Sequence, residues 1–292
     1  MTLNLWGDNG PWEARMALVG EALREIQPDV VALQEVREVP DKVPNQAAEL
    51  AAQQGWNHVF APSTAWGGGH EGLAVISRFP INAHDFKVLP HSTESEGRIV
   101  LSALVKSELG DIWIHTTHLS FREHEGKKRE DQVLAVDDEV FAHKNDNPQF
   151  VMGDFNAEPH SDEIRWLVGQ TTLGGRRVAY QDAWERQHPS GVPGYSPGFT
   201  WARVNAYTER LHWLKPDRRL DYIFVTPVRR DHRGTSHHLR TRRLRLFRHD
   251  CGCGHGCARS VDLDGRGWSV DSRPTRMSGC SHAAGSHLRG SH

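Results

Sequence analysis

The amino-acid sequence predicts an α/β (α+β) protein over residues 1–234. Apolar runs of strand length alternate there with stretches of helical periodicity. Hydrophobic residues make up 37% and charged residues 25% of the 292-residue chain, as in ordinary soluble globular proteins. No apolar run approaches the roughly 20 residues that a membrane-spanning helix needs. We therefore expect one large domain, or two modest ones, without a transmembrane segment.

The first elements follow one another closely along the chain. A short apolar strand at residues 2–6 enters a Gly-Asp-Asn-Gly turn, and Pro11 stands where a helix can begin. The next run, at residues 29–36, reads DVVALQEV and is a strand rich in β-branched residues. Between the two strands, one face of the predicted helix is apolar through Met16, Val19, Leu23 and Ile26.

The alternation continues as far as residue 234. A long charged pattern predicts a helix over residues 125–143, and clusters of Pro and Gly predict long loops at 61–69 and 189–198. Further strands are predicted at 73–77, 99–105, 111–119, 150–152 and 221–225.

Residues 235–292 differ from the rest of the chain in composition and charge. This segment has ten Arg and four Asp but no Lys or Glu, giving +6, whereas residues 1–234 carry 25 basic and 33 acidic side chains, giving −8. Arg, Gly, His, Ser and Cys make up most of the segment. Two explanations stay open, a disordered tail and a change of reading frame that replaced the natural C-terminus.

All four cysteines lie in this atypical tail. Residues 1–234 therefore need no disulfide, and the N-terminus has no signal-peptide pattern, so we expect a cytoplasmic protein unless the true start lies upstream. Cys251, Cys253, His255 and Cys257 stand two residues apart. Structural zinc sites prefer Cys pairs separated by two to four residues, so we interpret this cluster as incidental rather than as a zinc site.

Polar side chains lie at the ends of four predicted strands. A carboxylate directly after a buried strand is unfavourable unless water, a metal or a hydrogen-bond partner satisfies it. Oxygen ligands accompanied by single histidines favour Mg²⁺ or Mn²⁺ over zinc. The side chains are Glu35, His118, Asp154 with Asn156, and Asp221.

Each of these residues also has a purely structural explanation. Glu35 could be a solvated strand end, and His118 could be a satisfied core histidine. Asp154 could cap a turn, and Asp221 could pair with a neighbouring arginine. Their order along the chain, and the motifs that surround them, favour a shared site.

Six motifs occur in the order LNLWG (3–7), DVVALQEV (29–36), EGLAVISRFPI (71–81), THLS (117–120), GDFNAEP (153–159) and RLDYIFV (219–225). This order resembles the endonuclease/exonuclease/phosphatase superfamily, whose metal-dependent members include deoxyribonucleases, inositol phosphatases and bacterial sphingomyelinases. The resemblance covers about residues 2 to 226, and the pairing of LQE with GDFN is specific. It implies a four-layer α/β/β/α sandwich of two mixed sheets flanked by helices, with the site at one edge of the sheets.

The resemblance also implies a role for each matched residue. Glu35 matches the main metal-ligand carboxylate, and Asn4 matches the asparagine that helps to hold metal or phosphate. Asp154 matches the aspartate that aligns or deprotonates the attacking water, and Asn156 matches its orienting partner. His118 matches the histidine that donates a hydrogen bond to the scissile phosphate. A sixth residue, Asp221, matches the carboxylate that orients a later catalytic histidine.

The chain departs from the family at its C-terminal end. The family closes with Ser-Asp-His and one more strand, but this chain has no Ser-Asp-His, and neither Asp231-His232 nor His249-Asp250 is a suitable substitute. Losing one such electrostatic donor costs about 10²–10³ in rate. The sequence therefore supports two hypotheses: an active Mg²⁺-dependent phosphoester hydrolase, or a catalytically impaired or dead remnant whose last strand is missing.

The substrate class stays open between nucleic acid, a phospholipid head group and a small phosphorylated molecule. The acidic balance of residues 1–234 makes a non-specific nuclease less natural, because such enzymes gather a basic face against phosphates. Trp66, Trp201 and Trp213 lie in or near the predicted loops and could line a site or serve only as packing. We expect a monomer.

Overall fold

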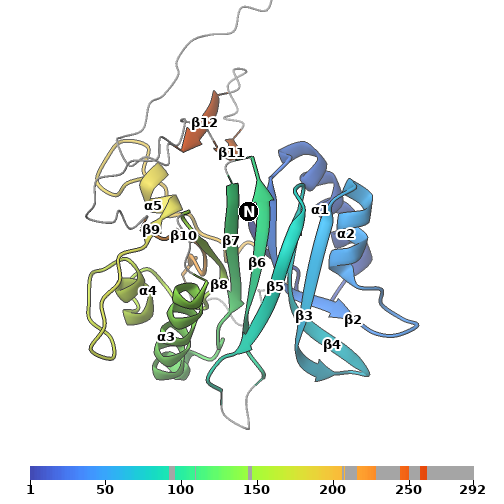
Figure 1. Ribbon diagram of the computed structural model, residues 1–292, viewed down its shortest axis with the longest axis horizontal. Coiled ribbons are helices and arrows are strands. Elements are labelled where there is room, and N and C mark those ends of the chain that lie inside the picture. The colour runs from blue at the N-terminus through green and yellow to red at the C-terminus, as the bar shows by residue number, and fades with distance from the viewer. Residues whose placement is uncertain are drawn as a thin grey trace, which may run out of the picture. The chain divides into compact units, whose positions relative to one another are not determined.

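The computed structural model describes residues 1–91, 96–108, 110–143, 147–205, 207 and 216–227, and the backbone of two short strands at 244–249 and 257–261. The chain divides into two units, Met1–Arg242 and Arg243–His292. The first unit contains two β-sheets with helices on their outer faces (Figure 1). The predicted α/β/β/α sandwich is thereby confirmed. Within the described residues, no helix is both long enough and apolar enough to cross a membrane.

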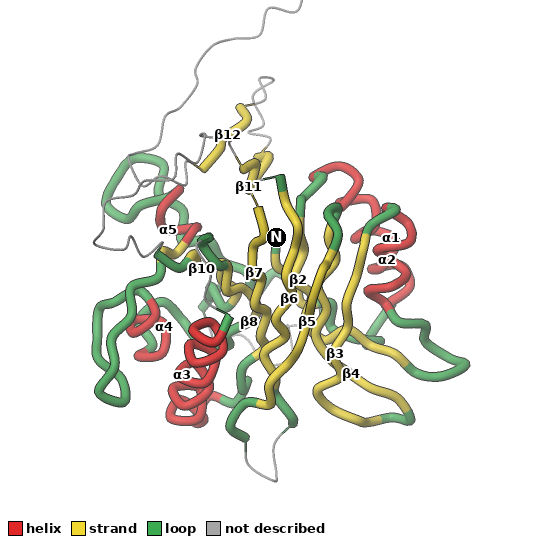
Figure 2. The backbone as a smooth tube through the Cα atoms, in the orientation of Figure 1, coloured by secondary structure: helices red, strands yellow, loops and turns green. Residues whose placement is uncertain are grey.

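The first sheet has four strands in the order β1-β2-β4-β3. Its strands are β1 (Thr2–Asn4), β2 (Val30–Glu38), β3 (Asn57–Trp66) and β4 (Gly69–Ser77). Helices α1 (Trp12–Ile26) and α2 (Gln46–Gln54) cover its outer face, as Figure 2 shows. Most of the apolar face predicted for α1 packs there: Met16 and Leu23 are buried in one cluster with Leu33 of β2 and Leu50 of α2, and Val19 is partly buried against it. Ile26, at the end of the helix, is exposed.

The second sheet has six strands in the order β5-β6-β7-β8-β10-β9. Its strands are β5 (Ile81–Val88), β6 (Ile99–Ser107), β7 (Gly110–His118), β8 (Phe150–Asp154), β9 (Gln181–Asp182) and β10 (Asp221–Val225). A 3-10 turn (Glu123–Glu125) precedes α3 (Gly126–Ala142), and two short helices follow, α4 (Asp162–Leu167) and α5 (Ala183–Gln187). The buried apolar residues of α3 and α4 form one cluster with residues of β6, β8 and β10.

The sheets face each other through a partly polar interior. Gln34 of β2 donates to the hydroxyl of Thr116 in β7, 3.0 Å away, and both side chains are fully buried. On the opposite face of β7, beside Trp113 and His143, His115 lies between Ser102, 2.9 Å from Nδ1, and Gln149, 2.7 Å from Nε2. Buried polar groups are tolerated when each has a partner, and these bonds supply one. Of these bonds, the one between Gln34 and Thr116 also links the two sheets.

The prediction of a long loop at residues 61–69 is wrong for most of these residues. Strand β3 runs through it to Trp66, and the chain reverses within Gly67 and Gly68. Both glycines have positive φ, 56° and 76°, which is the conformation that a tight two-residue hairpin requires. Pro62 is accommodated because β3 is an edge strand whose register shifts between Pro62 and Thr64. The loop predicted at 189–198 contains no helix or strand.

The second unit contains one antiparallel pair, β11 (Leu244–His249) with β12 (Cys257–Val261). Most of the atypical tail, including Cys251, Cys253 and His255, lies outside the described residues. Asp231 and His232 also lie outside them. The two explanations for the tail, the missing last strand and the domain boundary at residue 234 therefore stay predictions.

Burial of His115 predicts a loss of stability in acid. Burial lowers the pKa of His115 to about 4, so the folded protein resists a proton that the unfolded chain accepts near pH 6.5. The stability is present above pH 6.5 and is lost as the pH falls towards 4. From pH 7.5 to 5 this side chain alone should lower the free energy of unfolding by about 2 kcal/mol.

Urea unfolding of the wild type and of His115→Gln at both pH values checks this expectation. The glutamine variant should show a smaller loss between the two pH values, because it has no proton to gain. An equal loss in both proteins would contradict the assignment.

Candidate active site

Strand register brings three of the predicted residues into one row of the second sheet. His118 of β7 is paired with Asp154 of β8, and Asp154 is paired with Asp221 of β10. Asn4 reaches this row from the first sheet. Its amide nitrogen donates to Glu35 Oε1 at 2.8 Å and to Asp154 Oδ2 at 3.2 Å. The two sheets therefore meet at one group of side chains, which the sequence had placed at separate strand ends.

Glu35 enters this group through an irregularity in β2. The pairing of β2 with β4 shifts between Leu33 and Val36, and Glu35 has a φ of 52°. A bulge of this kind redirects a side chain that regular alternation would point elsewhere. A positive φ is unfavourable for glutamate, and such strained conformations concentrate at functional sites.

Asp154 is held by the glycine before it and the turn after it. A Cβ on Gly153 would lie 2.0 Å from the carbonyl oxygen of Thr117, so only glycine permits β8 to approach β7 this closely. The backbone N–H of Asn156 donates to Asp154 Oδ1 at 2.9 Å, and its side-chain amide donates to the carbonyl of Leu119 at 3.1 Å. Asn156 thus orients Asp154 through its backbone.

His118 is held as a neutral imidazole with a defined tautomer. Arg98 Nη1 lies 2.8 Å from His118 Nδ1. Because a guanidinium can only donate, Nδ1 accepts and the ring proton resides on Nε2. Burial, followed by the charge of Arg98, lowers the pKa of His118 well below its usual value. The Nε2–H therefore points towards Glu35 Oε1, 3.9 Å away, and Asp154 Oδ2, 3.8 Å away.

Sequence reasoning missed Arg98 and two residues close to the carboxylates. Glu71 of β4 lies near Glu35, whose charge, after burial, raises the pKa of Glu71 to about 7. The hydroxyl of Thr200 accepts from the backbone N–H of Asp221 at 3.2 Å. Burial raises the pKa of Asp221, and Thr200 offsets part of this rise. Glu71 opens the EGLAVISRFPI motif, and Arg98 precedes a predicted strand, so strand-end position was a signal for both.

The carboxylates have the donor chemistry of a divalent-cation site. Burial and Asp221 raise the pKa of Asp154 to about 7, and burial raises the pKa values of Glu35 and Asp221. The neighbouring carboxylates repel one another when they are ionised, and a hard cation such as Mg²⁺ would stabilise their ionised forms. Glu35 and Asp154 are the groups that fit such an ion. Asn4 turns its amide nitrogen towards both carboxylates, and its amide oxygen accepts from the backbone N–H of Trp6.

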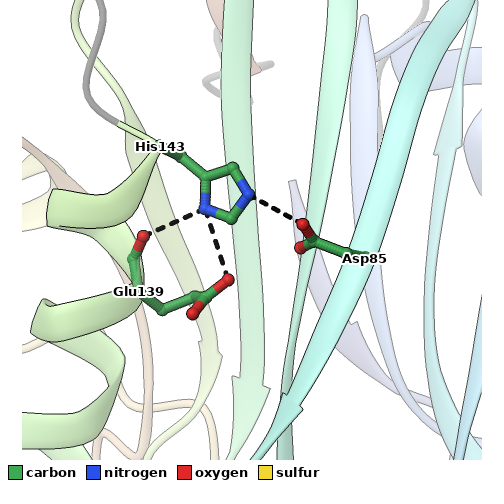
Figure 3. Close-up of side chains that lie close together, drawn as sticks. All are labelled: Asp85, Glu139 and His143. Carbon is green, nitrogen blue, oxygen red and sulfur yellow. Dashed lines mark hydrogen bonds and ion pairs between the residues drawn. The ribbon is translucent and has the colours of Figure 1, made fainter.

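A second group of possible metal ligands lies elsewhere, at Asp85, Glu139 and His143 (Figure 3). Asp85 Oδ2 is 3.0 Å from His143 Nε2, whereas Glu139 Oε1 is 3.3 Å from His143 Nδ1. One ion binds only one nitrogen of an imidazole, so this placement fits a clasp between α3 and β5 better than a metal centre. The His143 ring packs on Trp113, five residues or roughly 17 Å along β7 from His118.

The sequence pattern of the Endonuclease/Exonuclease/phosphatase family matches residues 1–275. This chain belongs to that family. The match includes Asn4, Glu35, His118, Asp154 and Asp221, which the structure brings to one place. Members of the Endonuclease/Exonuclease/phosphatase family generally depend on a divalent metal.

Individual relatives are distant. Nocturnin from Drosophila melanogaster is 24% identical over 243 residues, which are 75% of this chain but only 36% of that relative. The human Nocturnin catalytic domain with bound sulfate matches with a TM-score of 0.56 and 22% identity, over 76% of this chain and 78% of that one. The mannosyl-6-phosphatase Bt3783 of Bacteroides thetaiotaomicron has a TM-score of 0.58 and 16% identity, over 77% and 84%. These structural likenesses show a shared fold.

Replacing Arg98 should release the tautomer of His118. In Arg98→Met the donor to Nδ1 and its positive charge are both gone, so the pKa of His118 should rise and Nδ1 should no longer be held unprotonated. Arg98→Lys keeps the charge and is the matched control. Imidazole ¹⁵N shifts of the metal-free protein between pH 5 and 8 report both properties, and identical spectra for Arg98→Met and the wild type would contradict the arrangement.

Proposed function

We propose that this protein is a Mg²⁺-dependent phosphoester hydrolase, with Mn²⁺ as an alternative ion, that uses in-line attack by water. The observation that carries the proposal is the position of Asn4, which bridges Glu35 and Asp154 while the Nε2–H of His118 points towards the same two carboxylates. Hydrogen-bond donors and carboxylate acceptors thus converge on one small volume. Phosphoester hydrolysis needs both.

Each residue has a distinct proposed role. Glu35 would hold the cation, with help from Asn4 once its amide oxygen turns towards the ion, and the cation would withdraw charge from the phosphate oxygens. His118 donates from Nε2 to a phosphate oxygen as negative charge grows there, and Arg98 keeps that proton in place. Asp154 aligns and deprotonates the attacking water, with Asn156 orienting its carboxylate.

Asp221 lies beside Asp154 and is the sixth residue of the site. In the family resemblance it orients a later histidine, and in this structure it accompanies Asp154 across the β8–β10 pair. Its charge raises the pKa of Asp154, which favours proton uptake by Asp154 from water. We propose that Asp221 tunes Asp154 in this way.

A second candidate function is a catalytically impaired member of the family that binds metal and ligand without turnover. The specific observation in its favour is the lack of a Ser-Asp-His motif anywhere in the chain. Whether the substrate is a phosphate monoester or a diester is a separate choice within the proposed hydrolase function. A distant relative named as a mannosyl-6-phosphatase is compatible with a monoester.

Substitution of the central carboxylates should strongly reduce activity. Glu35→Gln and Asp154→Asn keep the shape of the side chains but remove their charge, so the Mg²⁺-dependent kcat/KM for bis(4-nitrophenyl) phosphate or 4-nitrophenyl phosphate should fall by about 10²–10³. Asp85→Asn, in the distant clasp, is the control and should retain full activity. A wild type without turnover in Mg²⁺ or Mn²⁺ would favour the impaired member.

Binding of Mg²⁺ should release protons at neutral pH. Asp154 and Glu71 both have a pKa of about 7, so each is partly protonated there, and a cation requires the ionised forms. Affinity should therefore rise from pH 6 to pH 8. Calorimetric titration in two buffers of different ionisation enthalpy counts the released protons, and Glu71→Gln should release fewer. Mg²⁺ binding that is independent of pH would contradict this expectation.

A further inference from the structure

Within the described residues, the two sheets of the first unit end in four edge strands, and three of these edges are protected against pairing with another chain. Strand β1 has three residues and β9 has two, so each offers little to an added strand. Strand β3 is longer, but it contains Pro62 and its register shifts there. Short strands, prolines and bulges are the means by which natural proteins keep sheet edges from associating.

Strand β5 is the fourth edge, and it lacks this protection over most of its length. Its register with β6 is regular from Ala83 to Val88, after one shift near Ile81. It contains no proline, and among the residues that the structure describes no strand pairs with its outer side. Phe86 and Val88 are 49% and 57% exposed. A long, regular and partly apolar edge of this kind is suited to pairing with a further strand.

The backbone of β5 directs alternate residues outwards. The N–H of Leu89 donates to the carbonyl of Arg98 at 2.8 Å, and this pair continues the register of β5 with β6. Bonded and non-bonded pairs alternate in an antiparallel ladder, so every second residue of β5, counted back from Leu89, is bonded to β6. The residues between them present their backbone N–H and C=O groups to the outer side. These outward residues are His84, Phe86 and Val88.

The side chains of β5 divide between the two faces of the sheet. Asp85 lies on the face that α3 covers, because its carboxylate is 3.0 Å from His143 Nε2 (Figure 3). Lys87 lies on the same face, 3.9 Å from the carboxylate of Glu139. By the alternation of a strand, Phe86 lies on the opposite face. The side chains of Asp85 and Lys87 are still 55% and 47% exposed, so each can also meet a charge from another chain.

Two identical β5 strands are complementary to each other in one antiparallel register. When Phe86 lies opposite Phe86 of a second copy, Asp85 of each strand lies opposite Lys87 of the other. His84 then lies opposite Val88, so all the outward backbone groups fall in bonded pairs. Opposite charges and aromatic pairs directly across an antiparallel ladder are both favourable. A shift of the register by two residues in either direction instead places Asp85 opposite Asp85 or Lys87 opposite Lys87.

We propose that β5 pairs antiparallel with β5 of a second copy of this chain, which joins the two six-stranded sheets into one continuous sheet. The charge pattern favours a second copy over a foreign strand, because Asp85 and Lys87 form two ion pairs with the same two residues of the partner. A two-fold symmetric dimer thus replaces the monomer expected from the sequence. Asp154 and Asp221 lie on β8 and β10, separated from this edge by β6 and β7, so the interface leaves the candidate site free.

Sedimentation velocity from low micromolar to submillimolar protein tests this pairing. The mass of the wild type should rise with concentration from 32.9 kDa towards twice that value. Lys87→Asp makes both charges of the strand acidic, and Asp85→Lys makes both basic. Each variant alone should dimerise at least about tenfold more weakly than the wild type, because like charges then face each other. An equimolar mixture of the two variants should dimerise again, since every acidic residue then faces a lysine.

Two further variants separate the backbone ladder from general effects of charge. His84→Pro removes an outward N–H without removing a bond to β6, so it should also weaken the dimer. Lys106→Asp makes the same change of charge as Lys87→Asp at an exposed position of the neighbouring strand β6, and it should leave dimerisation unchanged. Far-UV circular dichroism and thermal unfolding show whether each variant keeps its fold.

Hydrogen exchange of the wild type locates the interface residue by residue. Raising the protein concentration should slow exchange at the amides of His84, Phe86 and Val88, whereas the amides of Asp85 and Lys87 are already bonded to β6 and should change little. This measurement needs no substitution, so it decides the matter even where a variant fails to fold.

Three results would overturn the proposal. One is a wild type that keeps a mass of 32.9 kDa at every concentration, which would leave this edge to a strand of another protein. Another is a dimer that persists unchanged in Lys87→Asp, Asp85→Lys and His84→Pro, because the copies would then associate through a different surface. The third is exchange at the outward amides of β5 that does not depend on concentration while the mass doubles.

Discussion

The amide of Asn4 is the interaction on which the candidate site depends. It belongs to the first sheet, and it donates at once to Glu35 of that sheet and to Asp154 of the second. Both acceptors are carboxylates, which repel each other, so a shared donor between them lowers the energy of holding them together. Glu35 and Asp154 belong to different sheets, and this bridge is the hydrogen-bonded link between them. The buried Gln34–Thr116 bond, on the strands next to it, keeps the sheets in the required relation.

Electrostatic balance gives the site its chemistry. Arg98 is the cation that determines the tautomer of His118, and its charge also lowers the pKa values of Glu35, Glu71 and Asp154. Burial acts in the opposite direction on these acids and leaves two of them with a pKa of about 7. A site in this condition can take up a cation and release protons near neutral pH. It is therefore suited to metal-assisted chemistry.

Much of the architecture was predictable because the hydrophobic periodicity of a segment and the length of an apolar run can be read from the local sequence. The buried strands at 30–38, 99–107 and 150–154 are apolar along most of their length, and the helix at 126–142 is long and periodic. The exposed edge strand β5 has no such signal, and α2 was missed although Asn45 caps its start and Gly55 its end. The segment around Gly67 and Gly68 was predicted as a long loop, but it is a tight hairpin. Proline and glycine residues such as Pro62 occur in both kinds of structure, so their presence does not distinguish them.

The sequence by itself determined which chemical groups stand at the ends of the strands and, through its motifs, the family to which the chain belongs. It could not determine which groups touch. Contacts between Asn4 and Asp154, or between Arg98 and His118, depend on register and sheet packing, which are set by many weak interactions spread over distant segments. For the same physical reason only the tertiary structure placed Glu71 near Glu35, since its position next to a predicted strand does not say which residues of other strands it meets.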